Sequence, residues 1–317
     1  MENSSFIELF EQVQHCPLCK RPSNESIVLY SVYHFKWKIN ILLCKNCGLT
    51  YKSHFPTQTL FEKIYGELYI HYQHDNITHQ INELTDRVKR IGPPNGKLLD
   101  YGCGNGSFVI AALNNGWDAY GCDPFLPDKL ANNELYKRCE KKDFSISGYD
   151  TKDKYNCITM WATAEHLINS ESTFLNLFSQ LSKNGIFIFN SPYGKSKIAL
   201  KNGKNWRMSN IVEHLQFHTP QSVNYLATIG KMSVVNIRVC GSPYPFGSIN
   251  SNEVDRTKDK NDKNSNEVVS IKNRRNIKEI IYKELIMKNK FKSKDAISCL
   301  INKFKIGDHL EVILKKK

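Results

Sequence analysis

The chain has 317 residues, enough to bury one substantial core and to carry a small accessory domain. Its hydrophobic and charged fractions, 40% and 24%, are those of an ordinary soluble protein. No apolar run approaches the roughly 18 residues of a membrane span. The start, MENSSFIELFEQV, has no basic stretch followed by an apolar one, so no signal peptide is visible and we expect a cytoplasmic protein, at most peripheral to a membrane.

The formal net charge of +13 is compatible with acidic partners, but it is unevenly distributed. Residues 251–317 hold 18 lysines and arginines against 10 aspartates and glutamates, so +8 of the charge lies in the last fifth of the chain. Many lysines alternate with asparagine and isoleucine, as in compositionally biased proteins. A solvated basic face is therefore favoured over a nucleic-acid or membrane surface.

Near the N-terminus, four of the ten cysteines form two CxxC pairs: Cys16, Cys19, Cys44 and Cys47. Four thiolates complete the tetrahedral shell of Zn²⁺ and leave no open position, so the metal would be structural. Between the pairs, IVLYSVYHFKWKINILL is rich in β-branched and aromatic residues and predicts a hairpin. The pattern predicts a zinc-ribbon module, with a redox dithiol or an iron centre as alternatives. The six other cysteines are single and favour free thiols in a reducing compartment.

From Lys97 onward the pattern alternates between short strands and helices. Strands are predicted at KLLDYG, DAYGCD, YNCITMWA, GIFIFNSP and MSVVNIRV, and a helix at SFVIAALNNG that ends near Gly116. This alternation predicts an α/β fold with a doubly wound, mostly parallel, seven-stranded Rossmann-like sheet. The last stretch, GDHLEVILKKK, is expected to close the sheet as an antiparallel strand. Ligands of such sheets bind at the carboxyl ends of the strands.

The first strand runs into a loop with glycines at alternate positions: Gly102, Gly104 and Gly106. These glycines let the backbone turn sharply and approach a ligand closely. A dinucleotide-binding loop would read G-x-G-x-x-G, but its sixth position is Ser107 here, and Asp100 precedes the glycines. Asp123 ends the second strand, where an acid can accept hydrogen bonds from both hydroxyls of a ribose.

The D-x-G-x-G-x-G form resembles the first motif of class I S-adenosylmethionine (SAM) methyltransferases, and the resemblance covers most of the chain. It implies that the glycine loop and Asp100 bind SAM, with Asp123 on the ribose. It also implies that Asp143 meets the adenine amino group, with Phe144 beside the ring.

The segment TAEHL after the fourth strand resembles the EHV or EHL segment of ubiquinone-pathway-type methyltransferases. In some of those, a Glu three residues before the pair helps to bind a divalent cation. That position is Ala162 here, so the metal is not carried over, and Glu165 and His166 are interpreted as a structural pair supporting the cofactor loop.

The ribbon, a tyrosine-rich stretch, the SAM core and a second EHL segment together resemble zinc-containing methyltransferases of bacterial sugar and cell-surface glycan pathways, including sugar C-methyltransferases. In that group the tyrosine stretch lies over the cofactor, which implies that Tyr69 binds SAM; packing of a helix by Tyr65 and Tyr69 is the alternative. The matching EH pair implies His214 as the general base and Glu213 as the group that orients it or the substrate.

One position departs from the sugar C-methyltransferase pattern. Where that group carries a Tyr two residues before the Glu, this chain has Ile211. The departure leaves the acid partner of the base open, and with it the choice between carbon and oxygen methylation. His218, four residues after His214, is interpreted as a packing residue, with Thr219 and Pro220 beginning a helix.

The expected organisation has five parts: residues 1–55 as a zinc ribbon, 56–90 as a helical tyrosine-rich linker or lid, 91–247 as the SAM-binding core, 248–269 as a flexible insertion, and 270–317 as a basic amphipathic helix and closing strand. The expected function is SAM-dependent methylation of a small acceptor, a sugar, nucleotide-sugar or glycan precursor. A zinc-finger rRNA methyltransferase and a non-catalytic SAM-binding scaffold are the alternatives. A nucleic-acid partner is not expected, and the oligomeric state is not predicted.

Overall fold

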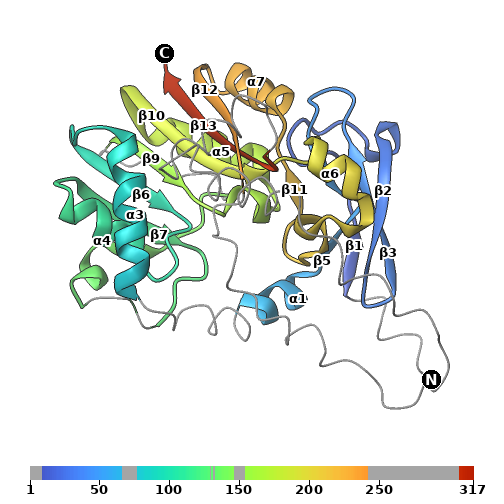
Figure 1. Cartoon of the computed structure of the whole chain (residues 1–317), viewed down its shortest axis with the longest axis horizontal. Coiled ribbons are helices and arrows are strands. Elements are labelled where there is room, and N and C mark those ends of the chain that lie inside the picture. The colour runs from blue at the N-terminus through green and yellow to red at the C-terminus, as the bar shows by residue number, and fades with distance from the viewer. Residues whose placement is uncertain (1–8, 66–76, 129, 131–132, 146–153, 242–306) are drawn as a thin grey trace, which may run out of the picture.

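The structure of the chain is a computed structural model that describes residues 9–65, 77–128, 130, 133–145, 154–241 and 307–317 (Figure 1). Three predicted features lie outside these residues: Tyr69, the insertion at 248–269 and the basic helix that follows it. Within the described residues, the strands form sheets of seven, four and two strands. Among these residues, none of the helices has the length and apolar character needed to cross a membrane.

The seven-stranded sheet has the order β12–β13–β10–β9–β6–β7–β8. Its strands are β6 (Lys97–Tyr101), β7 (Asp118–Asp123), β8 (Cys139–Lys141), β9 (Tyr155–Met160), β10 (Leu181–Pro192), β12 (Met232–Cys240) and β13 (His309–Lys316). Neighbouring strands from β10 to β8 are parallel, and β13 runs antiparallel to both β10 and β12. The predicted mostly parallel sheet and its antiparallel closing strand are confirmed.

Helices cover both faces of this sheet (Figure 1). They are α3 (Ile77–Ile91), α4 (Ser107–Asn114), α5 (Ser170–Gln180) and α7 (Pro220–Ile229). Alternate residues of one strand point to opposite faces: Leu98 packs in the hydrophobic cluster that contains α3 and α4, and Leu99 in the cluster that contains α5 and α7. The sheet is therefore buried on both sides, and the chain winds outward from β6 in both directions. The carboxyl end of β6 lies at this switch point, where α/β sheets bind ligands.

The four-stranded sheet belongs mainly to the N-terminal module. Its order is β11 (Gln216–Phe217), β4 (Thr50–Lys52), β3 (Trp37–Leu43) and β2 (Ile27–His34). Strands β2 and β3 pair antiparallel around Phe35 and Lys36, which have φ angles of 48° and 71°, so the predicted hairpin is confirmed. The two-stranded sheet joins β1 (Phe10–Gln12) to β5 (His54–Pro56), and η1 (Ser23–Glu25) precedes the hairpin.

Strand β11 is among the elements that were not predicted from the sequence. It follows the core strand β10 along the chain, yet Gln216 pairs with Tyr51 and Phe217 with Thr50 in the N-terminal sheet. The hydroxyl of Thr50 also donates to the carbonyl oxygen of Phe217 at 2.8 Å. The stretch around His214 is therefore attached directly to the N-terminal module. After β11, Thr219 caps α7 and Pro220 begins it, as predicted.

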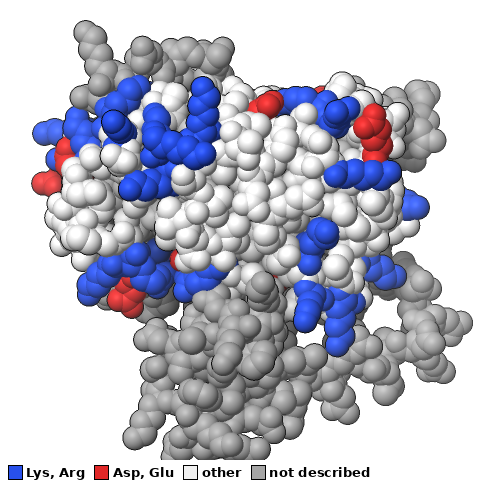
Figure 2. Space-filling view, turned by 90° about the horizontal axis from the view of Figure 1, so that it is seen from above, with Lys and Arg blue, Asp and Glu red and all other residues white. Residues whose placement is uncertain are grey.

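The remaining short elements lie in the connections between strands. They are α1 (Gln58–Lys63), α6 (Lys197–Asn202), η3 (Asn133–Lys137), η4 (Ala164–His166), η5 (Gly203–Asn205) and η6 (Arg207–Asn210). On the face seen in Figure 2, lysine and arginine side chains outnumber acidic ones and stand around the margin instead of gathering in one patch.

Candidate active site and metal centre

The glycine loop follows β6 and leads into α4 at the carboxyl edge of the large sheet. Its glycines share positive φ angles, 76° for Gly102, 51° for Gly104 and 82° for Gly106. Residues with a Cβ pay roughly 1–2 kcal/mol in this region. At Gly102 a Cβ would also lie 2.2 Å from the hydroxyl oxygen of Thr163, on the loop after β9. This loop therefore requires glycine for its shape and for its close contact with the neighbouring loop.

Asp123, at the end of β7, is hydrogen-bonded to the backbone of the glycine loop. Its Oδ2 accepts from the backbone N–H of Gly104 at 3.0 Å and its Oδ1 from that of Phe125 at 2.8 Å. Burial raises the pKa of the Asp123 carboxyl, and the two backbone hydrogen bonds oppose that rise. A carboxylate has about four acceptor positions, so Asp123 keeps capacity for the hydroxyls of a ribose. The residues present thus fit a SAM ribose at this edge.

Asp100 lies one layer deeper, beneath the loop. The hydroxyl of Thr159 donates to its Oδ1 at 2.8 Å, which links β6 to β9 at the switch point. Burial raises the pKa of the Asp100 carboxyl to about 7. These contacts give Asp100 a role in shaping the loop, and a direct contact with SAM stays a prediction.

The residues predicted to bind adenine lie after β8. Asp143 accepts two hydrogen bonds from Ser145, one from its backbone N–H at 2.7 Å and one from its hydroxyl at 2.8 Å. The Phe144 ring is 2% exposed and packs edge-on against Tyr101, and the Lys142 ammonium lies 5.0 Å from its centre. In this arrangement Phe144 packs the core, and its adenine contact stays a prediction.

An aromatic bridge connects the cofactor side of the site to the loop after β9. The Tyr65 ring stacks on Phe125, two residues after Asp123, with centroids 4.6 Å apart and planes at 15°. On its other side Tyr65 meets His166 at 6.1 Å. Tyr65 is the described member of the tyrosine-rich stretch. Its two ring contacts link the segment after Asp123 to the loop that carries His166.

The structure brings the two EH segments together. The His166 Nδ1 lies 3.0 Å from the carbonyl oxygen of Glu213, and the Leu215 N–H donates to the carbonyl oxygen of Glu165 at 2.7 Å. The His166 and His214 rings meet edge-to-face with centroids 4.8 Å apart. Since a carbonyl oxygen only accepts, the Nδ1 of His166 carries the proton. The two pairs, 48 residues apart in sequence, form one acid–base cluster.

Burial dominates the electrostatics of this cluster. It lowers the pKa of His166 to about 4 and that of His214 well below the ordinary value, so both imidazoles are neutral at pH 7. It raises the pKa of Glu165 to about 8 and also raises that of Glu213. Among the described residues, the Glu165 Oε2 and the His214 Nδ1 have no hydrogen-bond partner. An unpartnered, neutral imidazole nitrogen is a group that can accept a proton.

Glu165, His166 and His214 also form a set of possible metal ligands, with donor atoms within 4.8 Å of one another. However, the positive charge of Lys52 contributes to the low pKa of both imidazoles. A field that disfavours an imidazolium disfavours a divalent cation more strongly, because the repulsion grows with charge. The charge of Lys52 therefore argues against a divalent cation at these three side chains.

Lys52 is a residue of this site that the sequence analysis missed. It comes from β4 of the N-terminal module and is completely buried. Its Nζ donates to the carbonyl oxygens of Ile211 at 2.6 Å and Val212 at 3.2 Å. Burial lowers the pKa of Lys52 to about 7, opposed by the charge of Glu213. A lysine in a strand ordinarily faces solvent, so only the tertiary structure reveals this position.

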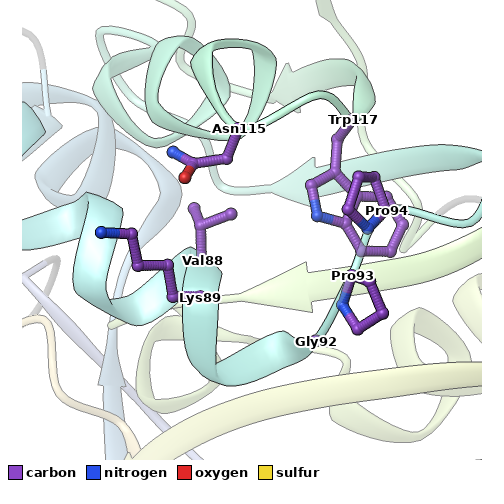
Figure 3. Close-up of a pocket in the computed structure, with 7 residues that line it drawn as sticks. All are labelled: Val88, Lys89, Gly92, Pro93, Pro94, Asn115 and Trp117. Carbon is purple, nitrogen blue, oxygen red and sulfur yellow. The ribbon is translucent and has the colours of Figure 1, made fainter.

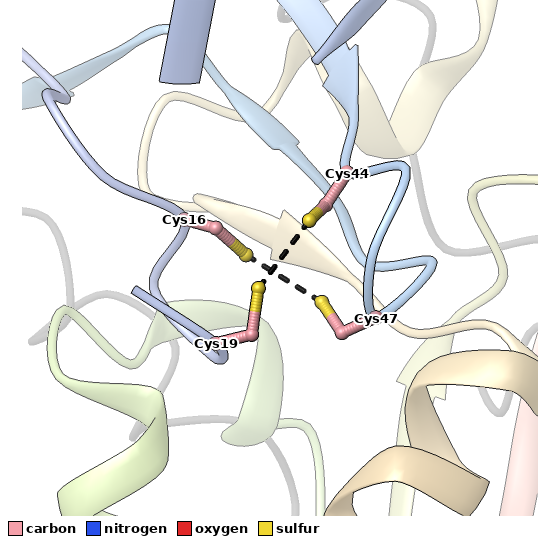
Figure 4. A group of neighbouring side chains, drawn as sticks. All are labelled: Cys16, Cys19, Cys44 and Cys47. Atoms are coloured by element: carbon pink, nitrogen blue, oxygen red, sulfur yellow. Dashed lines mark hydrogen bonds between the residues drawn. The ribbon is translucent and has the colours of Figure 1, made fainter. Parts of the chain in front are cut away.

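The four cysteines of the CxxC pairs converge on one point (Figure 4). The Sγ atoms of Cys16 and Cys47 are 3.6 Å apart, and those of Cys19 and Cys44 are 3.4 Å apart. A Zn–S bond of about 2.3 Å gives tetrahedral S···S edges of about 3.8 Å. The donor set and its spacing therefore fit Zn²⁺, which would tie the N-terminal knuckle to the end of β3.

The two knuckles repeat one backbone turn. The N–H of Lys20 donates to the carbonyl of Cys16 at 3.0 Å, and that of Gly48 to the carbonyl of Cys44 at 2.9 Å. Both donors have positive φ angles, 59° and 76°. The backbone is thus already shaped for a tetrathiolate site.

A separate depression of about 210 Å³ opens at the opposite end of the large sheet (Figure 3). It lies between the end of α3, the loop before β6 and the start of β7, and is lined by Val88, Lys89, Gly92, Pro93, Pro94, Asn115 and Trp117. It contains no residue predicted for the site. Because it lies at the amino ends of β6 and β7, it is remote from the edge where the glycine loop ends.

Comparison with known proteins identifies the class. Residues 69–228 match a family described as a methyltransferase domain, and the match covers half of the chain. The chain therefore belongs to this family, and the predicted Rossmann-like methyltransferase fold and enzyme class, SAM-dependent methyltransferase, are confirmed. A search of curated proteins finds no match to this chain.

Solved structures similar to this chain include three methyltransferases. A SAM-dependent methyltransferase from Archaeoglobus fulgidus is 16% identical, with 81% of this chain and 99% of that one covered and a TM-score of 0.44. A possible histamine N-methyltransferase from Thermotoga maritima is 16% identical, with 56% and 82% covered and a TM-score of 0.41. Magnesium protoporphyrin IX methyltransferase from Synechocystis is 13% identical, with 57% and 91% covered and a TM-score of 0.42. At these levels of similarity, no acceptor or residue role is transferred from them.

Proposed function

We propose that this methyltransferase transfers the methyl group of SAM to a small carbohydrate-type acceptor, a sugar, nucleotide-sugar or cell-surface glycan precursor, at oxygen or carbon. The observation that carries the proposal is the contact between the His166 and His214 rings beside Glu165, with the backbone carbonyl of Glu213 hydrogen-bonded to His166. A hydroxyl or an acidic carbon must lose a proton on methylation, and a neutral imidazole suits that task. The resemblance of the EHL segment to that of sugar C-methyltransferases supports the same acceptor class.

In the proposed reaction, bound SAM supplies an electrophilic methyl group on a sulfonium. His214 accepts the proton of the acceptor, and Glu213 orients His214 or the substrate. The His166 N–H holds the carbonyl of Glu213 and so fixes the turn that carries both groups. Positioning of the acceptor in line with the methyl group contributes much of the rate, because it removes the entropy cost of bringing the reactants together.

The proposal assigns the cofactor to the other side of the site. The glycine loop and Asp100 shape its binding surface, and Asp123 binds the ribose. Asp143, Phe144 and Tyr69 are proposed for the adenine and the sulfonium; an aromatic face near a sulfonium contributes roughly 0.5–2 kcal/mol. Zn²⁺ on the four cysteines is proposed as a structural ion of the N-terminal module.

The acceptor class is tested by screening with methyl-labelled SAM. The full-length, zinc-loaded protein is incubated with nucleotide-sugars, free sugars and glycan precursors in one set, and with ribosomal RNA in another. We expect label in a carbohydrate product, located on oxygen or carbon by NMR. Transfer to RNA alone would contradict the acceptor class, and failure to bind SAM or its demethylated product in calorimetry would contradict the cofactor assignment.

A further inference from the structure

A buried clamp joins the N-terminal module to the turn that carries Glu213 and His214. Lys52 makes three contacts through its Nζ: the carbonyl oxygens of Ile211 and Val212, and the His34 Nε2 at 2.9 Å. An ammonium group has three N–H donors, and here each has an acceptor. The geometry therefore accommodates a charged lysine in the interior of the protein.

His34, on β2, completes the clamp. Because the ammonium donates, the His34 Nε2 accepts, and burial lowers the pKa of His34 to about 4. The same ring also makes a hydrogen bond with the backbone of Ser209. The contacts of His34 and Lys52 together span the backbone from Ser209 to Val212, immediately before the proposed catalytic pair. Two strands of the module thus hold one turn of the active site.

A charged side chain buried at this position lowers the stability of the fold unless its charge has favourable interactions. Burial of an isolated ammonium costs several kcal/mol, and a neutral side chain could satisfy the same carbonyl oxygens more cheaply. The charge of Lys52 acts on Glu213, His166 and His214. It stabilises the carboxylate form of Glu213 and disfavours protonation of the two imidazoles. This charge effect acts in the same direction as burial, toward the neutral imidazole.

We propose that Lys52 is a positioning residue of the methyl-transfer site, whose buried ammonium donates to the carbonyl oxygens of Ile211 and Val212 and so fixes the turn that carries Glu213. The N-terminal module is then part of the acceptor side of the active site. The inference rests on the proposed roles of Glu213 and His214. The titratable groups that face Lys52 and His214 are His34 on β2, Glu165 and His166 on η4, Glu213 on the turn itself, and His309 on β13.

The first test uses full-length, zinc-loaded protein and needs no acceptor. The His166 protonation curve is followed by NMR with ¹³C-labelled histidine between pH 4 and 7 and assigned with His166→Gln. Lys52→Met removes the charge at nearly constant volume, and we expect it to raise the pKa of His166 by about 0.5–1. Lys52→Arg keeps the charge and is expected to keep the low value, whereas a loosened turn would raise it in both variants. Lys38→Met, at an exposed lysine of β3, is the matched control.

The second test uses the acceptor found in the screen. We expect Lys52→Met to lower kcat about 10- to 100-fold, because the catalytic turn loses its anchor, with the KM for SAM changed less than about twofold. The pH below which kcat falls should be higher in Lys52→Met than in the wild type.

If the His166 curve and kcat are both unchanged in Lys52→Met, the inference is overturned. If the His166 curve shifts but no carbohydrate is methylated, the proposed function fails while the clamp stands. If Lys52→Met does not fold, Lys52→Arg and His34→Gln are compared instead. An equal rise of the His166 pKa in both variants would mean that the clamp has only a structural role.

Discussion

The proposed cofactor and acceptor sides of the active site are built in different ways. The cofactor side is nearly continuous in sequence: the loop from Asp100 to Gly106 is followed 17 residues later by Asp123, and a backbone hydrogen bond joins them. The acceptor side is assembled from β4, η4 and the 211–215 turn, which are far apart in the chain. A short sequence motif can therefore specify the cofactor side. The acceptor side exists only when the N-terminal module is folded.

The two sheets also differ in how much each depends on other parts of the chain. The large sheet buries both faces under helices, with a large hydrophobic cluster on each side. The N-terminal sheet packs a smaller cluster around Ile39, Ile41 and Phe217, and takes its fourth strand from residues 216–217. Units of this size usually need a metal or other cross-link to be stable. Four predictions, from the largest expected effect to the smallest, separate the two sides of the site.

Removal of the zinc should have the largest effect. In small zinc modules the binding energy, about 10–16 kcal/mol at pH 7, is also folding energy. We expect Cys44→Ser, or treatment with a strong chelator, to unfold the N-terminal module and abolish methylation while SAM affinity falls far less. Metal analysis, calorimetry with SAM and limited proteolysis would measure this. Cys157→Ser, at a buried single cysteine of β9, is the control for general loss of a core thiol. Full methylation by metal-free protein would show that the acceptor side does not depend on the module.

Loss of the proposed base should have the next largest effect. We expect His214→Gln to lower kcat about 10²- to 10⁴-fold, the usual contribution of general base catalysis, with SAM affinity unchanged. His218→Gln is a useful comparison, because His218 is buried between Phe174 and Phe189, at 5.6 and 5.3 Å, and hydrogen-bonded to Ser222. That variant should lower stability more than kcat per folded molecule. Full turnover by a folded, SAM-binding His214→Gln enzyme would remove the proposed base.

Asp123→Asn should act on the cofactor side alone. Hydrogen bonds to a charged group contribute about 1.5–3 kcal/mol each, so the loss of the carboxylate should weaken SAM binding about 10- to 100-fold. Calorimetry with SAM measures the change, and saturating SAM should restore most of kcat. Asp118→Asn at the other end of β7, where Asp118 pairs with Arg138 in a half-exposed position, is the matched control. Unchanged SAM affinity in Asp123→Asn would mean that the ribose acid lies elsewhere.

The smallest effect concerns stability and pH. Burial raises the pKa of Glu165 from 4.5 to about 8, so the folded protein keeps a proton that the unfolded chain releases from pH 4.5 upward. Its contribution to stability is fully present below pH 4.5 and is lost as the pH rises through 8. A glutamine at position 165 does not ionise. The Tm of Glu165→Gln minus that of the wild type should therefore be several °C larger at pH 8 than at pH 5. Scanning calorimetry at both pH values measures this difference, and a constant Tm difference would show that Glu165 titrates normally.

Several features of the fold were predictable because they depend on neighbours in sequence. The strands that carry the large sheet, the glycine loop after β6 and the hairpin at residues 27–43 follow from short patterns of apolar residues and glycine. The CxxC spacing likewise predicted a cysteine cluster, because a four-residue turn brings each pair together. In each case the side chains and the local backbone geometry favour the same structure.

Other features could not be predicted in this way. No strand was predicted at residues 216–217, but they complete the sheet of the N-terminal module by pairing with Thr50 and Tyr51. His166 was interpreted as a support for the cofactor loop, and its contact with the Glu213 carbonyl depends on how two distant loops meet. No periodicity in the sequence contains that information.

The sequence by itself thus determined the class of fold, the cofactor loop with Asp123, and the set of cysteines that can hold a metal. These depend on residues a few positions apart, whose relative geometry the backbone constrains. Only the tertiary structure decided that Lys52 is buried against the 211–212 backbone and that His166 and His214 face each other. The physical reason is that such contacts arise from the packing of whole elements, in which burial can take a lysine out of water and give its charge a new role.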